Sequence, residues 1–184
     1  LEFRRVLFRS NESNAADSDI ITLLAVAHLW PPRTWTSLYE RAAYQATALA
    51  EFSARSNGQL RYVKTSADLQ EVIAQRAAGA DTIAAVYGIE GAHPLEGDLD
   101  NLDRLHDLGL RMIGLTHFFD NELGSSLHGE SRAGLTEFGR RVVRRAEALE
   151  IIIDVAHASP QMVRDRSEEH TSELQSPCNL VCRL

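Results

Sequence analysis

Apolar and polar residues follow one another along the chain in two patterns of spacing. Short runs rich in β-branched or aromatic residues indicate strands, and segments with an apolar residue at every third or fourth position indicate helices. We expect strands over 60–63, 83–87, 111–115 and 151–155, and a further buried strand over 20–29 that ends at Pro31 and Pro32. Helices are expected over 36–55, 66–79, 99–108 and 135–149, the second with Ser66 as its N-cap.

Strands that alternate with helices are typical of parallel βαβ units. Two α/β architectures then remain, an open doubly wound sheet and a (β/α)8 barrel. No G-x-G-x-x-G sequence follows any of the strands, which weighs against a dinucleotide-binding sheet. A complete barrel takes about 250 residues, so we expect the 184-residue chain to form a partial (β/α)8 TIM barrel.

Composition and charge argue against some classes of binding partner. The formal net charge is -7 and no basic cluster occurs, so we expect no nucleic acid and no anionic membrane surface as a partner. The longest apolar run is well below the ~20 residues that a membrane-spanning helix needs. The two cysteines, Cys178 and Cys182, lie close to the end of the chain and support neither a disulfide framework nor a zinc cluster.

The two ends of the chain differ from its middle. The head "LEFRRVLFRS" and the tail that begins "RSEEHTSELQSP" have no apolar periodicity, and both back-translate into sequences that resemble the two opposite adapters used in DNA sequencing. We therefore expect three parts: a non-native head over 1–10, a partial barrel domain over 11–165, and a non-native tail over 166–184.

Three successive strands are each followed by one ionisable side chain. Glu90 follows the strand over 83–87, His117 follows the strand over 111–115, and His157 follows the last strand. The C-terminal ends of the strands meet at one mouth in a barrel, which is where catalytic residues lie. We therefore expect these three side chains to come together.

Glutamate and histidine together suit a divalent ion of the zinc type, since imidazole is a borderline ligand and a carboxylate can bridge two ions. Such ions favour hydrolysis at neutral pH. Each residue also has a simpler interpretation on its own: a solvated loop acid for Glu90, a hydrogen bond to a backbone carbonyl for His117, and a structural pair with Asp154 for His157.

The other histidines of the middle segment are weaker candidates. We expect His93 to hold the loop after Glu90, His106 to be solvated on a helix, His28 to be a core residue, and His128 to lie in a mobile Gly/Ser-rich loop. Gly88 and Gly91 flank Glu90, and we expect them to let the backbone turn tightly there.

Two segments carry a resemblance to a known family. "GIEGAHPLEGDLDNLDRLHDLGLRMIGLTHFFDN" and "GLTEFGRRVVRRAEALEIIIDVAHAS" resemble the membrane dipeptidase (renal dipeptidase) family of metallopeptidases, through I-E-G-A-H, G-L-T-H and I-D-V-A-H in the same order and spacing. The resemblance implies a (β/α)8 barrel that holds two zinc ions, cleaves dipeptides by a metal-bound hydroxide and forms a homodimer.

The resemblance also implies roles for single residues. Glu90 matches the carboxylate that bridges the two ions, His157 matches a histidine ligand, and His117 matches the histidine that contacts the substrate and steadies the tetrahedral intermediate. The His-x-Asp pair that supplies the family's first ligands does not occur before Glu90. We therefore expect this chain to be a fragment of a dipeptidase that is inactive by itself.

Two other functions are compatible with the same residues. One is a different amidohydrolase on the same barrel, acting on lactones or cyclic amides. The other is a non-catalytic relative whose metal site has decayed, although the presence of both Glu90 and His157 weighs against it.

Overall fold

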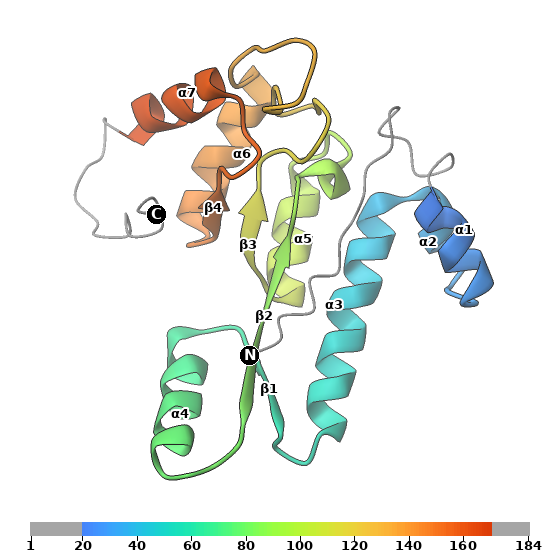
Figure 1. Cartoon of the computed structure of the whole chain (residues 1–184), viewed down its shortest axis with the longest axis vertical. Coiled ribbons are helices and arrows are strands. Elements are labelled where there is room, and N and C mark those ends of the chain that lie inside the picture. Colours follow the sequence, from blue (N-terminus) through green and yellow to red (C-terminus); the bar gives the residue numbers. More distant parts are fainter. Residues whose placement is uncertain (1–19, 171–184) are drawn as a thin grey trace.

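The computed structural model describes residues 20–170 (Figure 1). The adapter-like head and positions 171–184 of the tail lie outside the described residues. The elements are, in chain order, α1 (Ile20–Ala27), α2 (Arg33–Thr36), α3 (Leu38–Arg55), β1 (Leu60–Val63), α4 (Ser66–Ala77), β2 (Ile83–Ile89), the 3-10 helix η2 (His93–Leu95), α5 (Asp100–Leu108), β3 (Leu110–Gly114), α6 (Glu137–Ala148), β4 (Ile152–Asp154) and α7 (Pro160–His170).

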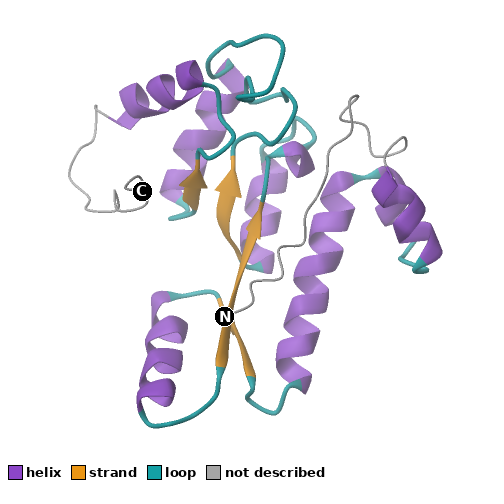
Figure 2. Cartoon of the chain, in the orientation of Figure 1, coloured by secondary structure: helices purple, strands orange, loops and turns teal. Residues whose placement is uncertain are grey.

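The four strands form one parallel sheet in the order β1-β2-β3-β4. Sequential parallel neighbours joined through helices confirm the α/β fold class and the strand order of a partial (β/α)8 barrel. The arrowheads of β2, β3 and β4 point toward the same end of the sheet, where the long loops gather (Figure 2). The residues that follow these strands are thereby brought to one edge.

The core lies between one face of the sheet and the helices α3, α5 and α6, which run alongside the strands (Figure 1). Two tyrosines fasten strands to helices across it: the hydroxyl of Tyr87 in β2 donates to the Ala42 carbonyl of α3 at 2.9 Å, and that of Tyr62 in β1 donates to the Leu108 carbonyl of α5 at 2.8 Å. Burial raises the pKa of both phenols, that of Tyr62 to about 12, so both remain donors.

The other face of the sheet is open. Gly88, Met112 and Ile152 stand in one row across β2, β3 and β4, and all three are exposed, as is Val86. Side chains on alternate positions of a strand point to opposite faces, which is why Ile89 and Ile113 are buried while Gly88 and Met112, which precede them, are exposed. The helices α3, α5 and α6 therefore share one side of the sheet, while α4 packs separately against β1 and β2.

The prediction of a buried strand over 20–29 is wrong, because this run forms helix α1. Leucine and alanine favour a helix, and α1 packs against α2 rather than pairing with any strand of the sheet. Of its side chains, Ala25 is buried while Leu23 and Leu24 are exposed. His28, expected in the core, is exposed as well.

Two helix starts differ from the expectation by a few residues. The helix expected over 36–55 begins at Leu38, because Ser37 is extended and its hydroxyl accepts the Glu40 N–H as an N-cap. The helix after β1 is capped by Thr65 and not by Ser66: Thr65 and Asp68 exchange side-chain to backbone hydrogen bonds in a capping box. Hydrogen bonds from the Thr65 hydroxyl and from the Lys64 N–H to the carboxylate of Asp68 lower its pKa to about 2.

Strand β2 is two residues longer than expected and runs through Gly88 to Ile89. Gly88 therefore does not turn the chain. A Cβ at this position would stand 3.1 Å from the Met112 side chain, so the glycine makes room for β3 beside it. The turn comes at Gly91, whose φ is +92°. The other strands and the helices α5 and α6 fall within two residues of the expected bounds, with Gly109 ending α5 at a φ of +114° as expected.

The loop after β2 is tied to the start of α3 by Glu96. Its carboxylate accepts the Leu38 N–H at 2.7 Å and the Ser37 hydroxyl at 3.1 Å. A negative charge at a helix N-terminus satisfies a backbone donor and interacts favourably with the helix dipole. This contact fixes the loop that begins with Glu90 against the first helix of the core.

Within residues 20–170, no helix is long and apolar enough to cross a membrane.

We expect Glu96→Ala to lower the free energy of unfolding by about 1 kcal/mol, the usual contribution of a helix cap. Urea denaturation followed by circular dichroism measures it. Glu51→Ala is the matched control, since Glu51 lies on the surface of the same helix and makes only an exposed pair with Arg55 at 3.7 Å. Equal losses in both variants would contradict the anchoring role of Glu96.

Candidate metal site at the strand ends

Glu90 is the first residue after β2, at the carboxyl end of the strand. The positive φ of Gly91 turns the backbone directly behind it, so the Glu90 side chain remains at the strand end instead of continuing along the sheet. Its side chain is 21% exposed.

His117 lies three residues beyond the end of β3 and is almost fully buried. Its backbone carbonyl accepts the hydroxyl of Ser126, which lies further along the same loop. This bond holds the backbone on which the imidazole is carried, and the Nε2 of that imidazole faces Glu90.

His157 follows β4 by three residues, and two neighbours hold its backbone. Its carbonyl oxygen accepts the Thr116 hydroxyl at 2.9 Å and the Leu127 N–H at 2.8 Å. Asp154 does not pair with this ring, because its carboxylate accepts the Ala156 N–H at 2.9 Å. The imidazole turns toward Glu90 instead.

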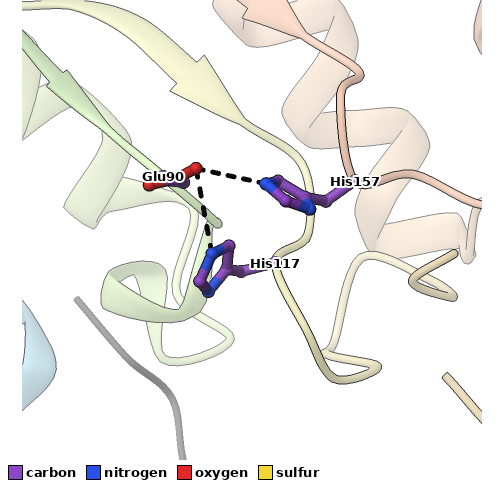
Figure 3. Close-up of side chains that lie close together, drawn as sticks. All are labelled: Glu90, His117 and His157. Atoms are coloured by element: carbon purple, nitrogen blue, oxygen red, sulfur yellow. Dashed lines mark hydrogen bonds and ion pairs between the residues drawn. The ribbon is translucent and has the colours of Figure 1, made fainter. Parts of the chain in front are cut away.

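The three side chains come together as the sequence predicts (Figure 3). Glu90 Oε1 lies 3.1 Å from His157 Nε2 and 3.8 Å from His117 Nε2. The two imidazole rings stand edge to face with their centroids 4.6 Å apart. The ligating atoms of all three lie within 4.8 Å of one another, so one divalent ion would fit among them.

Close packing of two glycines brings the strand ends together. A Cβ at Gly114, the last residue of β3, would stand 2.8 Å from the backbone nitrogen of Gly91. A Cβ at Gly91 would stand 2.8 Å from His93 Nδ1 and 3.1 Å from the His117 Cβ. The backbone after β2 therefore lies directly against β3 and His117, which sets the distance between Glu90 and the histidines.

The loop after β3 is organised around Asp120. Its carboxylate accepts the N–H groups of Ser126 and Ser131 and the hydroxyl of Ser125. Burial alone would raise the pKa of Asp120, but these hydrogen bonds outweigh it and lower that pKa below its ordinary value. Asp120 thus holds Ser126 in place, and Ser126 in turn holds the backbone of His117.

His93 lies behind the cluster, at the start of η2, and is buried. Burial, and next the neighbouring His117, lower its pKa to about 4 from 6.5. Its Nε2 has no hydrogen-bond partner among the described residues. The ring is therefore a neutral packing element of the loop, as expected for a residue that holds the loop rather than one that lines the site.

The remaining histidines stay outside the cluster. His128 is exposed in the loop after β3, with its ring centroid 5.8 Å from that of Phe118. His106 is half-buried on α5 rather than solvated, beside Asp107.

Several residues that position the site carry little signal in the sequence. Gly114 reads as part of an apolar strand, and Thr116, Asp120 and Ser126 read as ordinary loop residues. Their contribution depends on contacts between segments far apart in the chain, such as the bond from Thr116 to His157. Only the G-L-T-H and D-V-A-H sequences hinted that residues beside the histidines were constrained.

The sequence profile of the membrane dipeptidase family (peptidase family M19) matches residues 16–171. The chain belongs to this family. Among curated proteins it is 35% identical over 81 residues to an uncharacterized dipeptidase of Schizosaccharomyces pombe, covering 43% of this chain and 20% of that protein. It is also 29% identical over 136 residues to an uncharacterized protein from the pqqA 5' region of Klebsiella pneumoniae, covering 71% of this chain and 48% of that protein.

Solved structures of the family share the fold. The metallopeptidase dipeptidase AC matches with a TM-score of 0.59 at 26% identity over 67% of this chain and 36% of that one. A metallopeptidase from Rhodobacter sphaeroides, bound to a phosphinate mimic of the dipeptide L-Ala-D-Ala, matches with a TM-score of 0.54 at 26% identity over 67% and 35% of the two chains. The chain thus spans about half or less of the relatives that it matches.

Family membership implies a metal in this site, and the donors present fit one. Two imidazoles and a carboxylate are the ligand types that a zinc-like ion takes. The Nε2 atoms of both imidazole rings face the carboxylate and approach the same oxygen of Glu90.

We expect Gly91→Ala to destabilise the chain by about 2–4 kcal/mol. The positive φ costs an alanine about 1–2 kcal/mol, and the contacts of the new Cβ with His93 and His117 add overpacking. Gly79→Ala is the matched control, because Gly79 has a φ of +93° but no atom within 4 Å of an added Cβ. Urea denaturation of both variants measures the difference. Equal losses of unfolding free energy would show that the close contacts at Gly91 do not affect stability.

The lowered pKa of His93 predicts a loss of stability in acid. Below pH 6.5 the unfolded chain takes up a proton at His93 that the folded chain rejects until about pH 4, so stability falls as the pH drops through this window. His93→Gln removes this term. Between pH 7 and pH 4 the wild-type chain is expected to lose up to about 3 kcal/mol more than the variant, measured by urea denaturation at each pH. Parallel losses would contradict a buried neutral His93.

Proposed function

We propose that this chain carries one side of the active site of a zinc-dependent dipeptidase. The observation that supports this most directly is the meeting of Glu90, His117 and His157 at the ends of three adjacent parallel strands in a chain of the membrane dipeptidase family. The reaction class is hydrolysis of the peptide bond of a dipeptide.

In this proposal Glu90 and His157 hold the metal. Glu90 Oε1 lies near the Nε2 atoms of both histidines, and the Glu90 carboxylate would hold zinc together with His157. Zinc would supply a Lewis acid and lower the pKa of water toward neutrality. The hydrogen bonds to the His157 carbonyl keep the imidazole aimed at this position without using its ring nitrogens.

His117 has a separate role in the proposal. Its ring is buried, and the Asp120–Ser126 arrangement fixes its backbone. A rigid imidazole N–H beside the reacting carbonyl would donate to the oxygen that gains negative charge in the tetrahedral intermediate. Fixed donors of this kind contribute about 10²–10³-fold to turnover.

The substrate class comes from the family. A solved relative binds a phosphinate mimic of L-Ala-D-Ala, and a phosphinate resembles the tetrahedral state of a peptide carbonyl under attack. We propose that dipeptides are the substrates here also. The homodimer implied by the resemblance stays a prediction.

We also propose that hydrolysis of a dipeptide needs more of the protein than these 184 residues. Within residues 20–170 the sheet has four strands where a (β/α)8 barrel has eight, and the chain spans between a fifth and a half of the curated relatives that it matches. Further metal ligands and substrate contacts would come from the parts of the barrel that these 184 residues do not supply.

We expect the protein expressed from the uninterrupted reading frame to hydrolyse L-Ala-D-Ala in the presence of zinc, and the 184-residue chain to show no turnover. Glu90→Gln in the longer protein is expected to lower kcat/KM by at least about 10³-fold, because the several kcal/mol that a bound metal supplies are lost. Release of free alanine measures both. His128→Gln, on the exposed loop, is the matched control and should retain activity.

Three results would overturn the proposal. Hydrolysis of lactones or cyclic amides without dipeptide hydrolysis would favour another amidohydrolase. Zinc binding without any hydrolysis would favour a non-catalytic relative. Full activity of the Glu90→Gln variant would show that Glu90 is not a metal ligand.

A further inference from the structure

We infer that Phe118 is a specificity-determining residue of the proposed dipeptidase, and that its ring selects dipeptides that carry a large apolar or aromatic side chain. The inference rests on the proposed function and adds a substrate class to it. Phe118 follows His117 directly in the chain, in the loop between β3 and α6. Its phenyl ring has no hydrogen-bonding group, so it acts on a substrate through apolar and ring contacts.

The ring of Phe118 is exposed directly beside a side chain that is covered. Phe118 is 43% exposed, whereas His117 next to it is 2% exposed. The apolar surface of the ring therefore lies in contact with water, and the hydrophobic effect favours a ligand group that covers it. An apolar side chain of the substrate is such a group.

The ring lies next to both histidines of the site. Its centroid is 4.3 Å from that of the His117 ring and 5.8 Å from that of the His157 ring, with the planes tilted by 59° and 52°. The hydrogen bond from Ser126 to the His117 carbonyl fixes the peptide that joins His117 to Phe118. Phe118 is therefore held at a set position relative to the two imidazoles that face Glu90 (Figure 3).

A dipeptide bound for hydrolysis would reach this ring. In the proposed function the scissile carbonyl lies against Glu90, His117 and His157. The carbonyl carbon is bonded to one Cα of the dipeptide at about 1.5 Å, and the two Cα atoms are about 3.8 Å apart. Both side chains of the substrate thus begin within a few ångströms of the reacting carbonyl. The Phe118 ring then lies within the length of a large side chain.

Leu127 adds a second exposed apolar side chain to the loop that carries Phe118. It is 52% exposed, and its N–H donates to the His157 carbonyl at 2.8 Å, which places its backbone beside that histidine. Ligand sites are lined mostly by apolar side chains with a few polar groups. A charged side chain of a substrate would lose water against Phe118 and Leu127 without gaining a polar partner from either.

The test compares three dipeptides with the protein expressed from the uninterrupted reading frame: L-Ala-D-Ala, L-Phe-D-Ala and L-Ala-D-Phe. Wild-type protein is expected to hydrolyse one of the two phenylalanine dipeptides with a kcat/KM about 10–100-fold above that for L-Ala-D-Ala, the usual effect of covering a large apolar side chain. Phe118→Ala is expected to remove this preference, mainly through a higher KM for the phenylalanine dipeptide. Release of free amino acids measures the rates.

Two further variants serve as controls. Phe52→Ala removes a ring that is 59% exposed on the last turn of α3, where its centroid lies 5.4 Å from the Arg55 Cζ, and should leave the preference unchanged. Phe118→Leu keeps much of the apolar surface and should keep most of the preference. Circular dichroism of each variant checks that the fold is retained.

Three results would overturn the inference while leaving the dipeptidase in place. The first is a wild-type kcat/KM for L-Ala-D-Ala that equals or exceeds the values for both phenylalanine dipeptides. The second is a preference that Phe118→Ala retains. The third is a similar fall in kcat for every dipeptide in Phe118→Ala, which would mean that the ring supports His117 and does not contact the substrate side chain.

The proposed function fails on a different result. If the longer protein hydrolyses none of the three dipeptides, the dipeptidase and the role of Phe118 are overturned together. Hydrolysis of any of them sustains the dipeptidase, and the comparison of the three then decides the role of Phe118.

Discussion

The candidate site depends on one close contact between two segments of backbone. Gly114 ends β3 against the nitrogen of Gly91, at a distance that leaves no room for a Cβ. Gly91 at the same point turns the chain behind Glu90 with a positive φ. Because parallel strands end at a common edge, this single approach places the carboxylate of one βα loop opposite the imidazoles of the next two. Any side chain at either glycine would push them apart.

Around that contact, the loops hold the histidines by their backbones and leave the rings free to act. Ser126 binds the carbonyl of His117, Thr116 binds the carbonyl of His157, and Asp120 orders the loop that carries both donors. Imidazoles that are held in this way keep their nitrogens for a metal or a substrate.

Much of this arrangement could be predicted from the sequence, because the residues that indicate each strand and its end lie next to one another in the chain. Apolar runs located β1 to β4, and the ends of the last three strands then identified Glu90, His117 and His157. The prediction was wrong over 20–29, where two isoleucines suggested a strand but no strand of the sheet was available to pair with the run, which packs as a helix. Of the two glycines expected to turn the chain, Gly91 does so, but Gly88 instead makes room for Met112, a residue 24 positions later in the chain. Contacts of this range have no signature in a single sequence.

The central claim is that Glu90 and His157 hold a metal ion at the strand ends, and X-ray absorption at the zinc edge tests it most directly. The account predicts that the zinc-loaded chain shows light-atom ligands at about 2.0–2.2 Å with the outer-shell scattering of imidazole. A spectrum with no imidazole scattering, or with sulfur at about 2.3 Å from Cys178 and Cys182, would contradict it.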